Sequence, residues 1–415
     1  MEFKKITVGN FAENLDRFRI PLSSAEREKK RGKYPYYGAA KIIDYVDGFT
    51  HSGLSVLIAE DGSVETDKGY PVVQLANGEY WVNNHTHVLK GKNDWDTLYL
   101  YYALQIIKVS PFVTGAVQKK ISQKALNSME LNYFEDPMIR RKIVESLLEL
   151  DKKIELNTQI NQTLEQIAQT IFKSWFIDFD PVHAKANALA SGQTAEQATQ
   201  VAMAVISGKN TQELHRLQTA NPEQYQQLWE IAEAFPSGFD EEGVPRGWEE
   251  RYLKDVCNIV YGKGLPKNKL TEKGFYVFGA NGVIGFYDSY TYEKPQVLIG
   301  CRGTVGQVTL SYPYSFVTNN SLVIEYENSC VSMYYLEKYL SNINLKEISS
   351  GSVQPQITIQ NMSKVKILIP NIEILNFYSE KVKEIYDKRL HHFYENQSLS
   401  KVRDLLLPKL LSGEV

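Results

Sequence analysis

The stretch Ser55-Val56-Leu57-Ile58-Ala59-Glu60-Asp61-Gly62 decides the fold, because a related stretch follows 241 positions later, with Gly303 in the place of Gly62. The second stretch reads Gln296-Val297-Leu298-Ile299-Gly300-Cys301-Arg302-Gly303. Both are short runs of Val, Leu and Ile bounded by turn-forming residues, a pattern typical of a buried strand that ends in a turn. The chain therefore contains the signal of one β-rich unit used twice.

The same register extends outward from these two strands. Tyr36-Tyr37-Gly38 aligns with Val277-Phe278-Gly279 at the same offset. After five residues are lost from the second copy, Val82-Asn83-Asn84 falls near Thr318-Asn319-Asn320, and Gly115-x-Val117-Gln118-x-x-Ile121 falls over Gly351-x-Val353-Gln354-x-x-Ile357. One register with one break over about ninety residues indicates a duplication. We expect the paired glycines Gly38/Gly279 and Gly62/Gly303 to lie in turns that need a positive φ.

A long helix is predicted after each copy. From Ile143 to Trp175 apolar residues recur at alternating spacings of four and three, which is a coiled-coil seam. The pattern predicts a helix over 138–175, ended by Asp178-Phe179-Asp180-Pro181. A similar seam with one stutter runs from Tyr386 to Leu410. Asn161 and Asn396 fall at matching seam positions, where they either hydrogen-bond across the two helices or lie at a water-accessible edge.

The predicted fold class is α+β, with two similar β-rich domains separated by two long antiparallel coiled-coil helices in a pseudo-twofold duplication. Residues 1–136 form the first β-rich domain, 137–180 the central helix, 181–242 a helical connector, 243–370 the second β-rich domain and 371–415 the C-terminal helix. Within the connector, 184–235 is a helical insert of unassigned role, interrupted at Gly192, Gly208 and Asn221-Pro222.

Composition excludes several classes of protein. The 415 residues carry 46 Lys and Arg against 49 Asp and Glu, a net charge of −3. The acidity is concentrated in residues 181–250, and residues 251–415 carry 19 basic against 15 acidic side chains. No apolar run reaches the roughly 18 residues that a membrane span needs, and no secretory signal is visible. The three cysteines lack C-x-x-C spacing and fit free thiols in a reducing cytoplasm.

Motifs for catalysis are missing from the sequence. It contains no G-x-x-x-x-G-K-[ST] phosphate loop, no G-x-G-x-x-G between a strand and a helix, and no G-x-S-x-G elbow. The pairs His85-Thr86-His87 and His391-His392 lack the partner spacing of a metal site. Glu28-Lys29-Lys30 and Asp151-Lys152-Lys153 match an acid–x–Lys nuclease signature, but we interpret them as solvated charge. We therefore predict a binding protein with no catalytic residues and no metal.

Four segments resemble the DNA specificity subunit of type I restriction–modification systems. They are Gly243-Val244-Pro245-Arg246-Gly247-Trp248, Val297 to Gly306, Phe172 to Val182 and Leu405 to Gly413. The N-terminus departs from this pattern because it lacks the Gly-x-Pro-x-Gly-Trp opening seen at 243–248, and the insert at 184–235 is a second departure.

The resemblance implies two target-recognition domains that each read one half of a divided, asymmetric site in double-stranded DNA, with the helices as a ruler between them. It also implies two methyltransferase subunits and a restriction and translocation subunit as partners, no membrane, and a cytoplasmic location. S-adenosylmethionine, ATP and magnesium would be bound by those partners and no cofactor by this chain. Two alternatives stay open, namely a coiled-coil adaptor without DNA readout and a methyltransferase or nuclease with cryptic motifs.

Candidate base-contacting residues are polar side chains in or beside predicted loops that can pair with base edges or phosphates. In the first domain they are Lys41, His51, Ser63, Lys119 and Lys120. In the second domain they are Asn281, Arg302, Thr304, Gln354 and Gln356.

Overall fold

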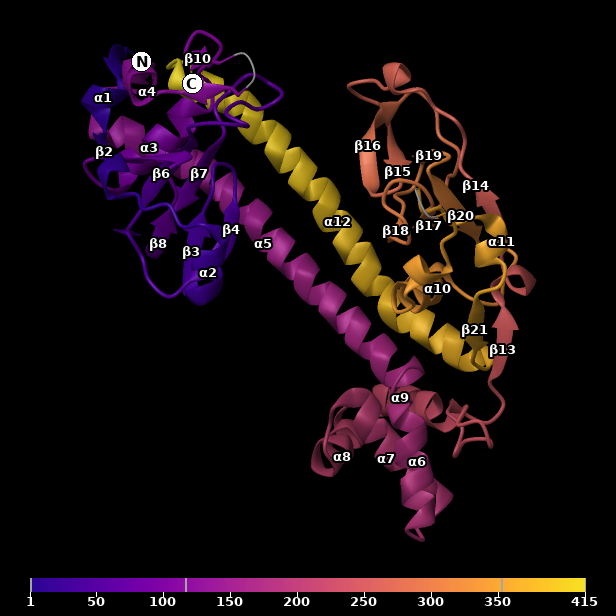
Figure 1. Cartoon of the computed structure of the whole chain (residues 1–415). Helices are drawn as coiled ribbons and strands as arrows, with labels where there is room; N and C mark the ends of the chain where they lie inside the picture. Colours follow the sequence, from indigo (N-terminus) through magenta and orange to yellow (C-terminus); the bar gives the residue numbers. More distant parts are fainter. Residues whose placement is uncertain (1, 116–117, 352–353, 415) are drawn as a thin grey trace. The chain divides into compact units, whose positions relative to one another are not determined.

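The computed structural model describes residues 2–115, 118–351 and 354–414 (Figure 1). The chain divides into two compact units, one of residues 1–158 with 393–415 and the other of residues 159–392. Each unit holds one β-rich module and a part of both long helices, α5 (Pro137–Phe176) and α12 (Ile372–Leu411). Residues 116–117 and 352–353 belong to the two motifs that the predicted duplication aligns, and they lie outside the described residues.

Module 1, defined as residues 4–133, contains twelve short strands and four short α-helices in its described part. One sheet has the order β2-β9-β6-β7 and a second has the order β4-β3-β8-β5, while β1 pairs with β12 and β10 with β11. The elements are β1 (Lys4–Thr7), α1 (Val8–Phe11), β2 (Glu13–Asn14), α2 (Ser24–Lys29), β3 (Arg31–Tyr37), β4 (Ile42–Val46), β5 (His51–Ser52), β6 (Ser55–Ala59), β7 (Val73–Ala76), β8 (Glu79–Val82), β9 (Thr86–Lys90), α3 (Asp94–Leu104), β10 (Val113–Thr114), β11 (Lys120–Ile121), α4 (Gln123–Ser128) and β12 (Glu130–Tyr133).

Module 2, defined as residues 249–369, repeats this plan. Its sheets have the orders β14-β20-β17-β18 and β16-β15-β19, and β13 pairs with β21. The elements are β13 (Glu249–Tyr252), β14 (Asn258–Tyr261), β15 (Phe275–Gly279), β16 (Gly282–Tyr287), β17 (Val297–Gly300), β18 (Val308–Leu310), β19 (Phe316–Val317), β20 (Ser321–Glu325), α10 (Met333–Ser341), α11 (Ile359–Met362) and β21 (Lys366–Ile369). Strand for strand, β14-β20-β17-β18 corresponds to β2-β9-β6-β7, so the predicted duplication is confirmed.

The strand registers correct one detail of the predicted alignment. Tyr37 pairs with Val82, and its counterpart Phe278 pairs with Val317 rather than with Thr318. The offset between the copies is therefore 235 at these strands, one less than the repeated Asn-Asn pair suggests. Farther on the offset of 236 holds, because the Ile121 amide donates to the Glu60 carbonyl at 2.8 Å and the Ile357 amide donates to the Cys301 carbonyl at 3.2 Å.

The paired glycines serve two different purposes. Gly62 and Gly303 both have a φ of +79°, as predicted, so they supply a left-handed turn after β6 and after β17. The prediction of a positive φ is wrong for Gly38 and Gly279. There a Cβ atom would lie 3.0 and 2.9 Å from the Cγ2 atoms of Ile43 and Ile284, so the close approach of a side chain is what requires glycine.

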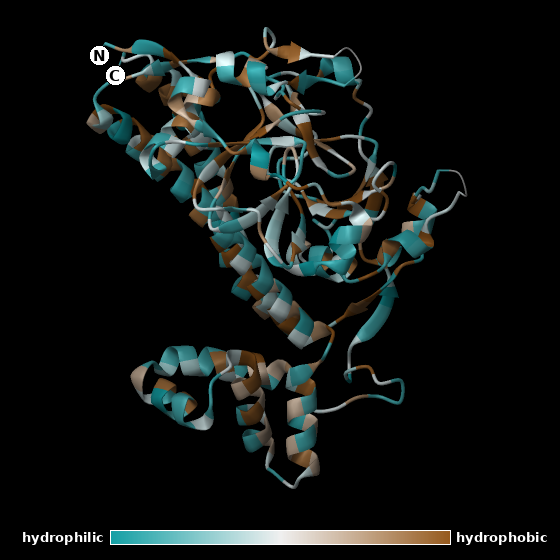
Figure 2. Ribbon diagram, turned by 60° about the vertical axis from the view of Figure 1, so that its left-hand side comes forward, coloured by the Kyte–Doolittle hydropathy of each residue, from teal (hydrophilic) through white to brown (hydrophobic). Residues whose placement is uncertain are grey.

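The long helices run antiparallel, because partner numbers on α12 fall as residue numbers on α5 rise. Arg403 pairs with Asp151 at 2.7 Å in the first unit, and Arg389 pairs with Glu165 at 2.5 Å in the second. Figure 2 shows apolar and polar residues alternating along the helices, as a coiled-coil seam requires.

The predicted pair of Asn161 with Asn396 is shifted by one turn. The Asn157 side chain donates to Asn396 Oδ1 at 2.8 Å, whereas Asn161 Oδ1 lies 2.9 Å from His392 Nδ1. Both seam asparagines therefore hydrogen-bond across the helices, each with a partner that the seam positions alone do not identify.

The insert between the copies is helical, with α6 (Asp180–Ala190), α7 (Ala195–Ser207), α8 (Thr211–Ala220) and α9 (Pro222–Ala234). Gly192 and Gly208 have a positive φ at the ends of α6 and α7, and the Asn221 side chain caps α9, as the sequence predicts. Buried Lys185 on α6 donates to the carbonyls of Ala232, Glu233 and Phe235, which fixes the end of α9.

Separate cores hold the two units. In the second unit the aromatic residues Phe172, Trp175 and Phe176 at the end of α5 are buried against module 2, so this part of the Phe172–Val182 segment serves packing. In the first unit Arg140 at the start of α5 pairs with Asp96 of α3 at 3.0 Å, and both side chains are buried. None of the helices in the described part of the chain combines the length and the hydropathy that a membrane span requires.

Candidate functional site

Several segments of module 2 meet where strand β17 ends, and we call this place rim 2. The Cys301 amide donates to the Asn320 carbonyl at 2.9 Å, and the Asn319 amide donates to the Lys263 carbonyl at 3.1 Å. A Cβ atom on Gly300 would lie 2.6 Å from the Ala280 carbonyl oxygen, so the β15–β16 turn is also close. Rim 2 comprises residues 261–263, 280–282, 300–304, 318–320 and 354–357.

The predicted residues of the second domain gather at rim 2. The Arg302 side chain donates to Gln356 Oε1 at 3.4 Å, and its guanidinium lies 5.9 Å from the centre of the Tyr261 ring. Asn281, Thr304 and Gln354 are exposed on the turns that complete the rim. The five predicted polar side chains therefore lie in one surface region, where four of them are exposed and Gln356 is partly exposed.

Rim 1 is the equivalent place in module 1 and comprises residues 60–63, 83–85 and 118–121. The Glu60 amide donates to the His85 carbonyl at 2.9 Å, and the Gly62 amide donates to the Lys119 carbonyl at 3.0 Å. Ser63, Lys119 and Lys120 are exposed there, and Lys41 is exposed on the β3–β4 turn.

His51 lies elsewhere, in the interior of module 1. Its side chain is stacked on Tyr80 and is 5% exposed, and its ring nitrogens lie 2.8 Å from Thr50 Oγ1 and 3.3 Å from the Leu15 carbonyl oxygen. Burial leaves this side chain no open path to a base, so its place in the fold does not suit the role the sequence suggested.

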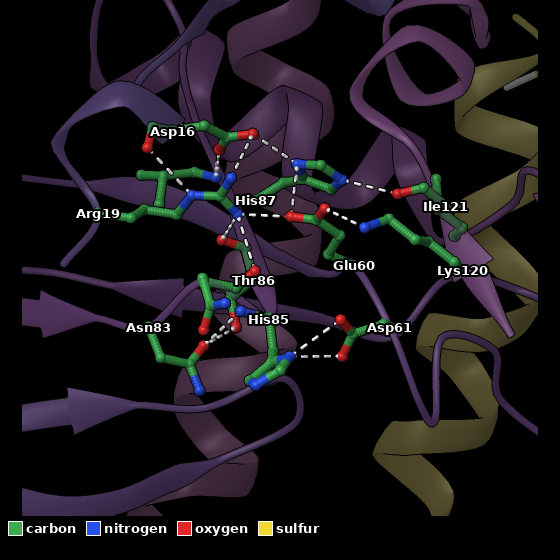
Figure 3. A network of polar contacts seen from close by, with 12 residues as sticks. Asp16, Arg19, Glu60, Asp61, Asn83, His85, Thr86, His87, Lys120 and Ile121 are labelled. Carbon is green, nitrogen blue, oxygen red and sulfur yellow. Dashed lines mark hydrogen bonds and ion pairs between the residues drawn. The ribbon is translucent and has the colours of Figure 1, made fainter. Parts of the chain in front are cut away.

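A charge cluster underlies rim 1 (Figure 3), and it consists of Asp16, Arg19, Glu60, His87 and Lys120. Glu60 accepts from Arg19 at 2.6 Å and lies 3.0 Å from Lys120 Nζ. His87 Nδ1 lies 2.6 Å from Asp16 Oδ2, and His87 Nε2 lies 2.8 Å from the Ile121 carbonyl oxygen. Each ring nitrogen of His87 thus faces an oxygen atom, so this side chain ties strand β9 to strand β11.

The electrostatics of the cluster favour ionised carboxylates. Burial by itself would raise the pKa of Asp16, but the hydrogen bond from His87 and the charges of His87 and Arg19 outweigh it, so the pKa lies below its ordinary value. Burial likewise opposes ionisation of Glu60, and the hydrogen bonds from Arg19 and Lys120 outweigh it and lower the pKa.

Asp16, Glu60 and His87 also have the mutual spacing of a metal-ligand set. However, Arg19 and Lys120 already supply positive charge to Glu60, and Arg19 also lies 3.4 Å from Asp16. A cation added beside the Arg19 guanidinium and the Lys120 ammonium would meet repulsion that a metal site is built to avoid. The donor set therefore fits an ion-pair network and does not fit a metal.

The two rims differ in how their cations are used. At rim 1, Lys119 pairs with Glu65, Lys120 with Glu60, and His85 with Asp61 at 2.7 Å. At rim 2, Arg302 and the nearby Lys263 are exposed and have no ion pair among the described residues. Sequence reasoning missed the charge cluster, whose members come from separate segments of the chain. It also missed Lys263, Lys267, Lys269 and Lys273, although four lysines within 262–274 are a visible signal.

The family model and the relatives that match this chain all carry the description of type I restriction specificity proteins. The family model described as type I restriction modification DNA specificity domain matches twice, at residues 1–166 and 245–402, and leaves the helical insert unmatched. The type I restriction enzyme HindI specificity subunit of Haemophilus influenzae is 38% identical over 327 residues, which cover 71% of this chain and 71% of the relative. A putative specificity subunit of the same organism, S.HindORF215P, is 25% identical over 88% of this chain and 82% of its own length.

A solved structure shares the fold. The crystal structure of the type I restriction–modification S subunit from M. genitalium aligns with a TM-score of 0.58 at 18% identity, covering 99% of this chain and 96% of the other. At this identity the likeness concerns the arrangement of helices and strands.

Proposed function

We propose that this chain, which belongs to the type I restriction–modification DNA specificity family, reads a divided DNA site with two unlike recognition modules. Specificity subunits recognise DNA targets and act in assemblies with partner subunits, so the chain contributes recognition and leaves catalysis to its partners.

The observation that carries the proposal is one strand order with two different sets of side chains at the same place. Rim 1 presents cations that acidic neighbours neutralise, whereas rim 2 presents an exposed Arg302 beside amide and hydroxyl side chains. Because the two modules share a strand order but present different side chains at their rims, we expect them to recognise different base sequences. The two half-sites therefore differ, and the complete site is asymmetric.

We assign base or phosphate contacts to the exposed or partly exposed predicted residues. These are Lys41, Ser63, Lys119 and Lys120 in module 1, and Asn281, Arg302, Thr304, Gln354 and Gln356 in module 2. His51 is left out because its ring is buried. Lys119 and Lys120 are ion-paired with Glu65 and Glu60, so any contact that they make with DNA competes with these carboxylates.

The long helices set the distance between the half-sites in this proposal. Two major-groove contacts on one face of B-DNA favour a separation of about 34–36 Å, one helical turn. This separation implies a nonspecific spacer of a few base pairs between the half-sites. Lengthening or shortening both helices by whole turns should change the length of that spacer. In this proposal the recognition domains are residues 1–136 and 243–370, the spacer helices are 137–180 and 371–415, and the connector is 181–242.

The partners in this proposal are two methyltransferase subunits and a restriction subunit. The methyltransferases bring S-adenosylmethionine and flip the target adenine out of the duplex, and the restriction subunit brings ATP and magnesium. The assembly acts in the cytoplasm, where its DNA lies. Partners that supply most phosphate contacts explain how a subunit with a net charge of −3 takes part in DNA binding.

Footprinting of the complex of this chain with its methyltransferase on DNA tests the proposal. We expect protection of two short segments with an unprotected or sequence-independent spacer between them. Arg302→Ala should weaken binding by about 1–3 kcal/mol and relax the base preference in one half-site only. Sequence-independent binding, or no binding, would instead favour the coiled-coil adaptor, and methyl transfer by the chain alone would favour a cryptic enzyme.

A further inference from the structure

The segment that joins β14 to β15 in module 2 begins at rim 2 and carries four lysines. Lys263, Lys267, Lys269 and Lys273 are all exposed, and Lys267–Lys269 form one 3-10 turn. Between them lies only one acidic residue, Glu272. We call these four side chains the lysine strip.

The backbone holds the strip in place at both ends. The Lys263 amide donates to the Val317 carbonyl at 2.8 Å, and the Lys263 carbonyl accepts from Asn319 at 3.1 Å. Farther on, the Thr271 amide donates to the Phe286 carbonyl at 2.9 Å. The strip is therefore anchored to β19 and to β16 and reaches the rim that carries Arg302.

The charges of the strip have no partner within the described residues, in contrast to module 1. The corresponding segment of module 1, between β2 and β3, carries Arg17, Arg19, Arg27, Lys29 and Lys30, and all of them except Lys29 lie within 4 Å of a carboxylate. Arg27, for example, pairs with Asp44 at 3.0 Å and Arg19 pairs with Glu60 at 2.6 Å. Most cations of this loop are therefore ion-paired in module 1, whereas none of the four lysines in module 2 has an ion pair among the described residues.

A row of exposed ammonium groups fits a linear polyanion. Lysines act as point charges toward phosphate oxygens and release condensed counterions when they bind a duplex. The strip begins at rim 2, which carries Arg302, Asn281 and Gln356, the side chains that can hydrogen-bond to base edges. Backbone contact beside base contact is the arrangement that positions a protein on DNA.

We propose that the lysine strip is the phosphate-binding surface of module 2 and holds the DNA backbone of its half-site, whereas module 1 makes few such contacts. The proposal rests on the proposed function, since it concerns the DNA that the chain reads. It makes the two modules unequal: of the phosphate contacts that this chain itself makes, module 2 contributes the larger part, and module 1 contributes chiefly shape and hydrogen bonds.

Salt dependence of binding tests this inequality. In the complete complex with the methyltransferase, the variant with Lys263→Ala, Lys267→Ala and Lys269→Ala should lower the slope of log affinity against log salt by about two to three, at about 0.9 for each lost phosphate contact. Lys294→Ala is the matched control, because Lys294 is an exposed lysine of the same module that pairs with Glu327 at 3.5 Å. The control should leave the slope unchanged.

DNA with uncharged methylphosphonate linkages locates the contacts. Linkages placed in the half-site of module 2 should weaken wild-type binding and have little further effect on the triple variant, and linkages in the other half-site should weaken both proteins by the same small factor. The proposed role of the lysine strip would be wrong if the triple variant kept the salt slope of the wild type. It would also be wrong if uncharged linkages weakened wild-type binding equally in both half-sites. If wild type itself fails to distinguish its site from scrambled DNA, the proposed function fails, and the strip fails with it as a part of that function.

Discussion

Replacing Glu60 by Gln perturbs the charge cluster of module 1 with the smallest change of shape. Glu60 is 12% exposed and neutralises Arg19, which is 16% exposed, and Lys120, which is 49% exposed. The variant leaves Lys120 without its carboxylate partner and leaves Arg19 with Asp16 alone, at 3.4 Å. Breaking a buried ion pair costs about 3–5 kcal/mol, and the half-exposed Lys120 reduces this to about 2–3 kcal/mol.

Amide hydrogen exchange measures this loss for each module separately, which matters because a chain of two units need not unfold in one step. A loss of about 2–3 kcal/mol corresponds to exchange about 30- to 150-fold faster in β6 and β9, since about 1.4 kcal/mol is a factor of ten. The exchange rates of strands β17 and β20 in module 2 should stay unchanged. Module 2 has Cys301 at the position equivalent to Glu60, so the substituted ion pairs have no counterpart there.

The matched control is Glu79→Gln, which changes an exposed carboxylate on β8 of the same module. It should leave exchange in β6 and β9 unchanged. If Glu60→Gln speeds exchange there less than about threefold, or speeds exchange in both modules equally, the cluster does not stabilise module 1 in the way its geometry implies.

Three further outcomes follow from the structure. The pKa values of Asp16 and Glu60 lie below their ordinary values of 3.8 and 4.5. The stability that their charges contribute is therefore fully present above pH 4.5 and is lost as the pH falls through the lowered pKa values. Circular dichroism should show acid unfolding of the wild type, and Glu60→Gln should show a less steep dependence on pH. Lys185→Met should cost about 1–3 kcal/mol, since three buried carbonyls lose their donor, and faster exchange at the end of α9 would report it. Gly303→Val should cost about 1–3 kcal/mol in thermal unfolding through its left-handed φ alone, and Gly303→Asn clearly less.

Local patterns predicted the elements well because their causes are local. The alternating apolar spacing and the Asp-Pro signal placed a helix over 138–175, and α5 spans Pro137–Phe176. The glycines of the insert ended helices where the sequence indicated. The repeat of Val-Leu-Ile runs was sufficient to identify two copies, which the matching orders β2-β9-β6-β7 and β14-β20-β17-β18 confirm.

Features that depend on tertiary register were harder to predict. Asn396 pairs with Asn157 rather than Asn161, because the axial stagger of two helices is not written in either seam. The charge cluster draws on Asp16, Glu60 and His87 from three separate segments, so no spacing rule joins them. Whether a lysine is neutralised by a carboxylate or stays available depends on a neighbour that is distant in sequence, as the contrast between Lys119 and Lys263 shows.

Mapping methylated adenines across a host genome, with this chain present and with it deleted, tests the central claim most directly. We predict methylation at a divided, asymmetric motif with two specified half-sites around an unspecified spacer, and its complete loss when the chain is removed. A contiguous or palindromic motif, or a motif that persists without the chain, would contradict the account of two unlike modules that together select the site.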